Sequence, residues 1–414
     1  MVQAHEIVVN PENEWRLKST PPANWQKGVR REDSKKYFMI SCDTHLNPPV
    51  TLFRDRLDAK WHDLLPRVEK RENGERYVVM PGARPERLID FQFEGEDLLR
   101  SRAGGDTMSA PGSGAVGLQR IADQEMDGVE GEVIFPNGPA LFMWSSTDTD
   151  FVSAQCAVWN DWAWEICGPY VDRCSPAAAI CTADIEGAVR EVQRVAKKGF
   201  RLLTLPCKPI WGAHDVSHIN YNLPVFDPLW AAIQDADLTI TYHVATGKDP
   251  RAARGNGGAI INYVVHALAP TIEPIVSMCS SGVFERFPKL RVATIEADAG
   301  WVPWMMHKMD EAYRKHHFWV RPKLKQLPSE YYRSNCFASF GEDDTAMRLV
   351  EPLGLEDNFM WANDYPHHEG SWPHSAEAIE RTFGEGLKET TRAKLLGLNA
   401  AKAFRFPIPE RYRD

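Results

Sequence analysis

Paired cysteines are missing from this sequence. Its eight cysteines lie scattered in apolar surroundings, and no two of them have the Cys-x-x-Cys spacing. This pattern excludes a zinc knuckle and a disulfide scaffold. We therefore expect eight reduced thiols: Cys42, Cys156, Cys167, Cys174, Cys181, Cys207, Cys279 and Cys336.

A leader and a long hydrophobic run are also missing. The first ten residues, MVQAHEIVVN, contain no basic segment followed by an apolar one. The longest apolar stretch, residues 151–171, is interrupted by Asn160, Asp161 and Glu165. We therefore expect no secretion signal and no membrane span, and we expect the chain to reside in the cytoplasm.

Positive charge is in the minority. Lys and Arg number 48 against 57 Asp and Glu, a formal net charge of −9, and no basic run compensates for it. Such a surface repels nucleic acid and anionic membranes, so we expect neither as a partner. The balance of 43% hydrophobic and 25% charged residues is that of a globular protein. We expect a small-molecule substrate and a homo-oligomer, most simply a dimer.

Short apolar, β-rich runs alternate with longer amphipathic stretches along the chain. The stretch 184–199 is typical of the helices, because Asp184 can cap its start and Gly199 can end it. Strand followed by helix, repeated eight times, indicates an α/β fold of the (β/α)₈ TIM barrel type. The eight predicted strands are 37–42, 132–136, 177–182, 200–206, 238–243, 291–296, 335–340 and 358–363.

Two regions fall outside this repeat. Residues 1–36 are polar and contain proline, and we expect an N-terminal extension that precedes a barrel spanning 37–414. Residues 54–115, rich in Arg, Glu and Gly, form an insertion after the first strand. Loops after strands lie on the active-site face of a barrel, so the insertion is a candidate lid or oligomer contact, or else a solvated decoration. Residues 375–405 should form two closing helices.

Metal-ligand residues fall at the ends of three predicted strands. Asp43 and His45 follow the first strand two residues apart, so their side chains should point the same way. His243 ends the fifth strand and Asp364 ends the eighth. Two carboxylates and two imidazoles at one rim suit Zn²⁺, Mn²⁺ or Fe²⁺, with a position left for water.

Several segments, in this order, resemble the amidohydrolase-related branch of the amidohydrolase superfamily, which includes aminocarboxymuconate-semialdehyde decarboxylase and the resorcylate decarboxylases. The resemblance covers residues 37–404. It is carried by CDTHLNPP, RIADQEMDGVEGEVIFPN, AVWNDWAWEIC, FDPLWAAIQDADLTITYHVATG, GVFERFPKLRVATIEADAGWVPWMMHKMD, NDYPHHEGSWPHS and LLGLNAAKAF.

The resemblance implies a metal ion bound by Asp43, His45 and His243. It further implies that Asp364 contacts the metal and handles the proton of the bound water. The first motif of the family is often His-x-His, whereas the decarboxylase relatives have an acidic residue at the first place, as this chain does. An aspartate can also bind a metal ion, so the expected set of metal ligands is retained.

The chain departs from its decarboxylase relatives at the sixth strand. They carry a histidine in a stretch like His-Gly-Gly or His-Met-Gly, whereas this chain has IEADAG, with Glu296 or Asp298 in that place. The carboxylate could be a metal ligand, a general base or a buried structural acid. Alternation from Val292 leads us to expect Glu296 at the barrel mouth, as a catalytic residue and a metal ligand.

One residue bears on the number of metal ions. Binuclear members of the wider superfamily use a carboxylated lysine near the place of Lys208. A lysine at the surface or facing the substrate is the simpler interpretation. The prediction is one ion, with two kept open.

Four residues are candidates for substrate binding. His367 matches the Asp-Tyr-Pro-His of the family. Arg251 and Arg254 lie in the glycine-rich segment 247–258 beside His243 and could clamp an anionic group. That segment lacks the P-loop spacing. Trp211, like Trp144, follows a strand and could line an aromatic pocket.

We predict a metal-dependent hydrolase that attacks the amide, ester or thioester carbonyl of a small organic acid, with Asp364 accepting the proton of the water. The alternative is a metal-dependent non-oxidative decarboxylase of an aromatic or unsaturated carboxylic acid. The missing histidine at the sixth strand favours hydrolysis. A binding protein with an inactive site is disfavoured because Asp364 is retained.

Overall fold

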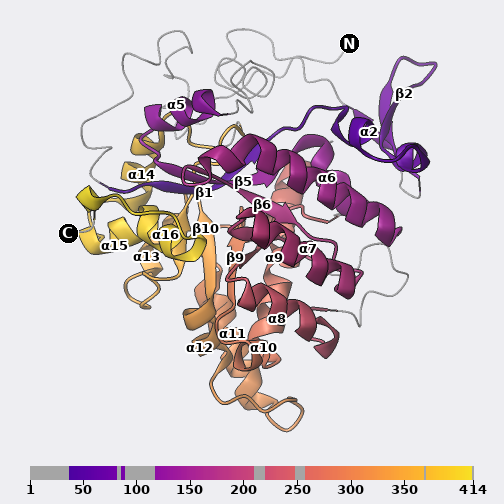
Figure 1. Cartoon of the computed structure of the whole chain (residues 1–414). Helices are drawn as coiled ribbons and strands as arrows, with labels where there is room; N and C mark the ends of the chain where they lie inside the picture. The colour runs from indigo at the N-terminus through magenta and orange to yellow at the C-terminus, as the bar shows by residue number, and fades with distance from the viewer. Residues whose placement is uncertain are drawn as a thin grey trace.

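Eight parallel strands form one sheet in the computed structural model, which describes residues 37–81, 85–88, 117–208, 220–247, 257–367 and 370–412 (Figure 1). Each strand pairs with the next along the chain, and a bridge between Thr44 and Tyr365 joins the first to the segment after the last. The predicted (β/α)₈ barrel is therefore confirmed. Its strands are β1 (Ile40–Leu46), β5 (Gly131–Pro136), β6 (Cys174–Ala179), β7 (Leu202–Thr204), β8 (Thr239–His243), β9 (Arg291–Ile295), β10 (Cys336–Phe340) and β11 (Phe359–Trp361).

Helices cover the outside of the barrel (Figure 1). In α7 (Ile185–Lys198), Asp184 holds the N-cap position without a side-chain capping bond, and Gly199, at φ 112°, ends the helix in the left-handed region. In α13 (Asp344–Leu349), the Asp343 carboxylate caps the helix by accepting from the Ala346 N–H. The helices are α5 (Leu118–Met126), α6 (Thr149–Cys167), α7 (Ile185–Lys198), α8 (Asp227–Asp235), α9 (Ala259–Ser280), α10 (Val283–Arg286), α11 (Val302–Lys315), α12 (Pro328–Asn335) and α13 (Asp344–Leu349). Short 3₁₀ turns occupy Gly138–Ser145, Gly168–Tyr170 and Pro224–Phe226.

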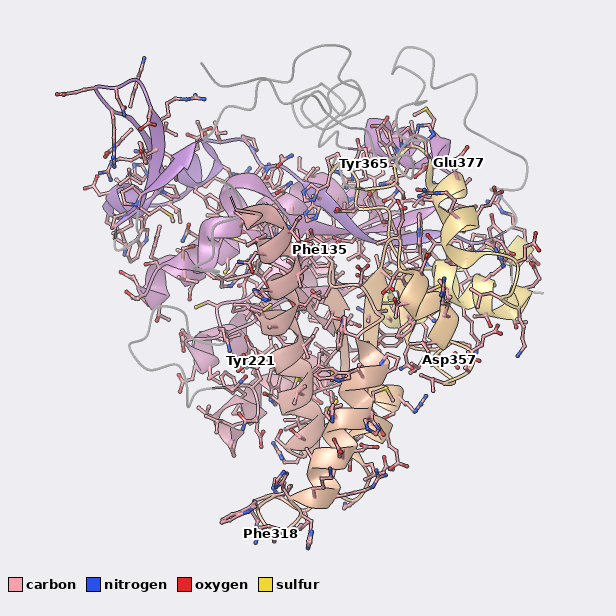
Figure 2. The ribbon with its side chains drawn as sticks, turned by 180° about the vertical axis from the view of Figure 1, so that it is seen from behind. Phe135, Tyr221, Phe318, Asp357, Tyr365 and Glu377 are labelled. Carbon is pink, nitrogen blue, oxygen red and sulfur yellow. The ribbon has the colours of Figure 1, made fainter. Side chains whose placement is uncertain are left out.

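The strands are buried on both faces, which explains their continuous apolar sequences. One face fills the barrel interior with side chains such as Val133, Leu202, Ala293 and Met360. The other face packs against the helices. Figure 2 shows Phe135 within the molecule and Phe318 at its far tip. Among the described residues, no helix is long and apolar enough to cross a membrane.

The described part of the insertion contains structure that the sequence patterns did not predict. A helix α2 (Leu52–Arg56) and a 3₁₀ turn (Ala59–Leu64) lead into a small antiparallel sheet of β2 (Arg67–Lys70), β3 (Arg76–Val79) and β4 (Glu86–Leu88). Because β2 is exposed along its whole length, its sequence RVEK has no apolar alternation to reveal it. The roles of the insertion stay predictions, and residues 1–36 lie outside the described chain.

The C-terminal prediction of two helices is confirmed, because α14 is followed by one unbroken helical run over residues 389–404. The chain forms α14 (Ser375–Phe383), α15 (Glu389–Ala393), a π-helical turn (Lys394–Leu398), α16 (Asn399–Phe404) and a final 3₁₀ turn (Glu410–Tyr412). Gly384, at φ 58°, ends α14 and starts the break between the two helical runs. Alanines of α16 and Phe404 pack into the same cluster as the interior residues of the barrel, so this helix closes the end opposite the mouth.

Candidate metal centre

Asp43 and His45 lie inside β1 rather than after it, and a β-bulge decides where they point. Ser41 pairs with Glu132 but Thr44 pairs with Ile134, so β1 has one extra residue at this point. Ile40 and Cys42 fill the barrel interior, whereas Leu46 packs outside. The extra residue shifts the alternation between them, so that Asp43 and His45 face the barrel mouth.

His243 reaches the same place by regular alternation. Its neighbours in β8, Ile240 and Tyr242, pack against the helices, which leaves His243 on the inner face. The Nδ1 atom of His243 lies 2.6 Å from the Val244 carbonyl oxygen and can donate to it. This bond leaves the lone pair of Nε2 free to bind a metal. The Nε2 atom lies 3.2 Å from Oδ1 of Asp43.

Glu296 is positioned by its backbone conformation and not by the alternation that we expected. Val292 packs against the helices, whereas Ala293 and Ile295 face inward, so alternation would turn Glu296 away from the mouth. Its φ of 57° reverses the direction of the side chain. The Oε2 atom then lies 3.4 Å from Nε2 of His243, and the Glu296 N–H donates to Ser339 Oγ.

Asp364 lies three residues beyond β11, with φ 53°. Its N–H donates to the Asp43 carbonyl oxygen at 3.1 Å, which ties it to β1. Its Oδ1 lies 3.2 Å from Nε2 of His45, and its Oδ2 lies 3.3 Å from Nδ1 of His367. The two histidine rings stack with centroids 4.1 Å apart.

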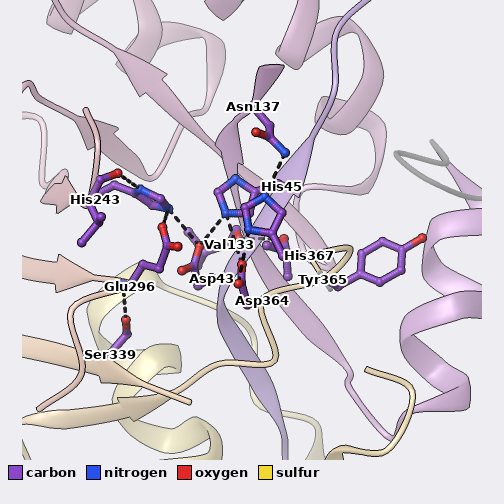
Figure 3. Close-up of polar contacts among 12 residues, drawn as sticks. Asp43, His45, Val133, Asn137, His243, Glu296, Ser339, Asp364, Tyr365 and His367 are labelled. Atoms are coloured by element: carbon purple, nitrogen blue, oxygen red, sulfur yellow. Dashed lines mark hydrogen bonds and ion pairs between the residues drawn. The ribbon is translucent and has the colours of Figure 1, made fainter. Parts of the chain in front are cut away.

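Asn137 was missed by the sequence analysis. Its amide lies 3.0 Å from Nε2 of His367, on the side of that ring away from Asp364 (Figure 3). A sequence signal existed, because Asn137 directly follows the second barrel strand, at the same rim as the other site residues. Together, Asn137 and Asp364 fix the orientation of the His367 imidazole.

These residues form two overlapping groups that could hold a metal ion. Asp43, His45, His243 and Glu296 each offer a ligand atom, all within 4.8 Å of one another, and His45, Asp364 and His367 form the second group (Figure 3). The Nε2 of His45 and Oδ1 of Asp364 are buried, yet neither makes a well-aligned hydrogen bond to any described residue. Buried polar atoms normally have partners, and a cation between these two would supply one. The donor set therefore fits a divalent ion.

The pKa values of the cluster residues also indicate that the site favours positive charge. Burial favours neutral His243, but the carboxylates of Asp43 and Glu296 raise its pKa to about 9. Burial raises the pKa of Glu296 to about 8, helped by the charges of Asp364 and Asp43. Burial, followed by His367, lowers the pKa of His45. A bound cation would replace the proton on Nε2 of His243, so metal binding should release a proton.

The remaining predicted residues have different outcomes. Lys208 pairs with the Glu273 carboxylate, which agrees with the simpler interpretation of this lysine. Trp144 is buried in the core and donates to the Ile180 carbonyl, so it is not a pocket residue. Trp211, Arg251 and Arg254 lie outside the described residues.

The sequence model of the amidohydrolase family matches residues 131–406, which begin at β5. Gamma-resorcylate decarboxylase from Rhodococcus jostii (strain RHA1) is 25% identical over 256 residues, which are 59% of this chain and 75% of the relative. The crystal structure of an amidohydrolase from Mycobacterium avium subsp. paratuberculosis K-10 matches with a TM-score of 0.68 and 20% identity, over 89% of this chain and 99% of the other. A mutant of 5-carboxyvanillate decarboxylase from Novosphingobium aromaticivorans DSM 12444, solved with bound manganese and 3-methoxy-4-hydroxy-5-nitrobenzoic acid, matches with a TM-score of 0.62 and 18% identity, over 91% and 99%.

The prediction of carbonyl hydrolysis is wrong, because the relatives whose names state a reaction are decarboxylases. The argument from the missing histidine fails for a chemical reason. A carboxylic acid can deliver a proton as an imidazolium can, so Glu296 in that place does not exclude decarboxylation. With the family match extending over β5 to α16 and the barrel complete, the chain is an enzyme that belongs to the amidohydrolase family.

Proposed function

We propose that this protein is a divalent-metal-dependent, non-oxidative decarboxylase of an aromatic carboxylic acid, with Mn²⁺ as its metal. One observation carries the proposal. Three imidazoles and three carboxylates converge at the barrel mouth, where His45 Nε2 and Asp364 Oδ1 are buried without aligned partners. The named relatives support the reaction class, and the manganese bound to one of them supports the metal.

Four residues would hold the ion: Asp43, His45, His243 and Asp364. Asp43, His45 and His243 are each at most 2% exposed, so their geometry is set by the surrounding core. When bound, the ion supplies positive charge that can orient the carboxylate of a substrate and compensate the acids around it. Phe135 packs against the His243 ring, with centroids 4.7 Å apart, and keeps water from that side.

Glu296 is the residue that we assign as proton donor. Its side chain is 30% exposed, against 2% for Asp43 and 14% for Asp364, so it is the carboxyl group most open to an entering substrate. The bond between the ring carbon and the carboxylate carbon breaks, and its electron pair stays on the ring carbon. The Glu296 carboxylic acid transfers its proton to that carbon, CO₂ leaves, and solvent reprotonates Glu296.

The test uses the full chain loaded with Mn²⁺ in D₂O, with gamma-resorcylate and 5-carboxyvanillate as probes. We expect CO₂ release and a product that carries one deuterium at the former carboxyl position. Removal of the metal by a chelator should abolish turnover, and Mn²⁺ should restore it.

The Asp364→Asn variant provides a second test. It preserves the shape of the side chain but removes the charge of a proposed metal ligand, so its turnover should fall. Incorporation of ¹⁸O from labelled water into a product acid, without CO₂, would overturn the decarboxylase assignment. So would the absence of turnover with hydroxybenzoates and other aromatic carboxylic acids in a protein that binds Mn²⁺.

A further inference from the structure

A cluster of buried polar side chains surrounds α5, next to the metal centre but separate from it. Arg120, Gln124 and Asp127 come from α5 and its C-cap, Glu132 from β5, and Asn363 from the segment after β11. We call these five residues the α5 clamp. Each is at most 3% exposed. Buried charges at this density are unusual for a helix of nine residues and require an explanation.

Arg120 holds the strand that carries two metal-ligand candidates. Its guanidinium binds both oxygens of Glu132, which fixes its plane. Its Nη1 donates to the His45 carbonyl oxygen at 2.9 Å, and its Nη2 donates to Thr44 Oγ1 at 3.0 Å. The His45 carbonyl group and the side chain of the preceding residue, Thr44, are thereby attached to α5.

Gln124 and Asp127 hold the segment that carries Asp364. The Asn363 amide donates to Gln124 Oε1 at 3.1 Å and to Asp127 Oδ2 at 3.0 Å. Gln124 also donates to Glu132 at 2.6 Å, which joins the two halves of the clamp. The neighbour of Asp364 in the chain is therefore connected, through two side chains, to the arginine that holds His45.

This connection spans the junction between β1 and the segment after β11, which is the weakest strand pairing of the barrel and which we call its seam. Thr44 and Tyr365 form an isolated bridge where the other neighbouring strands form ladders. The Tyr365 ring lies over Arg120, and its hydroxyl donates to Asp123 of α5 at 2.9 Å. His45 lies on one side of the seam and Asp364 on the other, so their separation depends on side chains as well as on the sheet.

We propose that the α5 clamp is a positioning device that sets the separation of His45 and Asp364, and through it the affinity for the metal ion. Its residues touch neither the ion nor the substrate in this arrangement. Hydrogen-bond partners of ligand-bearing groups commonly change metal affinity about 10- to 100-fold when they are removed. The effect on affinity rests on the metal centre, and the effect on turnover rests on the proposed function.

The test replaces Gln124 with Met, which keeps the size of the side chain but breaks both of its clamp bonds. Asn335→Leu is the matched control: this buried amide donates to the Leu290 and Pro288 carbonyls at the opposite end of the barrel. Titration calorimetry measures the Kd for Mn²⁺, and electron paramagnetic resonance spectroscopy reports the coordination geometry of the bound Mn²⁺. Thermal unfolding of the metal-free protein measures its stability.

We expect Gln124→Met to raise the Kd for Mn²⁺ about 10- to 100-fold and to change the spectrum. Asn335→Leu should lose comparable thermal stability but keep the wild-type Kd. Arg120→Lys is a second variant in which the buried Glu132 retains a positive partner, so folding is preserved while the contact to His45 is lost. It should also weaken Mn²⁺ binding.

A wild-type Kd and spectrum in both clamp variants would overturn the inference and reduce the cluster to a structural role. Failure of wild-type protein to bind Mn²⁺ would overturn the metal centre and the clamp together. Wild-type protein that binds Mn²⁺ without decarboxylating any aromatic acid would overturn only the proposed function, because the Kd measurements would still decide the clamp.

Discussion

Two acids at the barrel mouth adopt the left-handed backbone conformation that residues other than glycine rarely use. Glu296 has φ 57° and Asp364 has φ 53°. This conformation costs on the order of 1 kcal/mol for a residue with a Cβ atom. Each conformation directs a carboxylate toward an imidazole of the cluster, Glu296 toward His243 and Asp364 toward His45. The backbone strain therefore occurs at the two residues whose carboxylates it directs into the cluster, as is common at functional sites.

The first prediction concerns Glu296→Gln. The amide cannot transfer a proton to a ring carbon, so kcat should fall more than about tenfold, equivalent to more than about 1.4 kcal/mol of barrier. The Kd for Mn²⁺ should change less than about threefold, because four other residues hold the ion. Steady-state kinetics and metal titration of the same preparation measure the two quantities.

The control for this variant is Glu342→Gln, which changes an exposed acid after β10 that pairs with Arg381. It should leave both quantities unchanged. A large loss of Mn²⁺ affinity in Glu296→Gln would instead identify Glu296 as a metal ligand. Unchanged kinetics in a folded, metal-loaded variant would show that the residue is structural.

At the scale of elements, irregularities in β1 and after β11 matter more than the regular strands. A regular β1 would have turned Asp43 and His45 toward the helices, since Ile40 and Cys42 already face inward. The bulge before Thr44 places both ligands in the mouth, and the bonds from α5 then hold this irregular strand in place. Strand irregularity and the α5 clamp are thus parts of one arrangement.

The second prediction concerns Asp127, the C-cap of α5. Its burial raises the pKa to about 7, although Ser375 and Asn363 donate hydrogen bonds that act in the opposite direction. The unfolded chain releases this proton near its ordinary value of 3.8, whereas the folded protein keeps it until about pH 7. Stability should therefore fall as pH rises between about 4 and 7, and level off above that.

Denaturant unfolding of the metal-free protein between pH 4 and 8 measures this effect, with Asp127→Asn as reference. The stability of the wild type relative to the variant should decline with pH by at most roughly 4 kcal/mol. When the free energy of unfolding of the variant is subtracted from that of the wild type, the contributions of Glu296 and His243, which titrate in the same pH range, cancel. Parallel curves for the two proteins would contradict the raised pKa.

For the whole molecule, the metal ion should join elements that are far apart in the sequence. The ligand candidates come from β1, β8 and the segment after β11, so an ion bound to all three closes the seam of the barrel. A ligand that binds only the folded state stabilises it by mass action. The barrel should therefore be measurably more stable with metal than without.

The third prediction follows from this linkage. Mn²⁺ at about 100 times its Kd should raise the free energy of unfolding by about 2.7 kcal/mol. Calorimetric scans with and without Mn²⁺ measure the shift in Tm, which should grow with Mn²⁺ concentration. The shift should disappear in His45→Ala. A Tm that does not depend on Mn²⁺ would contradict a resident metal at this site.

The sequence by itself determined the barrel and the approximate place of the site. Eight apolar runs alternate with amphipathic helices, and parallel strands buried on both faces leave this pattern directly in the sequence. Because the carboxyl ends of all barrel strands meet at one rim, Asp43, His45, His243 and Asp364 could be predicted to lie together from their positions at or near the ends of the predicted strands.

Only the tertiary structure decided how these side chains point and what holds them. The bulge in β1, the left-handed turn at Glu296 and the α5 clamp depend on contacts between residues that are far apart in the chain. The Asn363 N–H, for example, donates to Ser41 Oγ across 322 positions of sequence. The small sheet of the insertion was not predicted from the sequence for a different reason: an exposed strand such as β2 has no alternation of apolar and polar residues. The local sequence pattern shows which residues are buried and whether they repeat as a strand or a helix. At a bulge or a left-handed turn, the direction of a side chain is set by contacts with residues far away in the chain, which the local pattern does not contain.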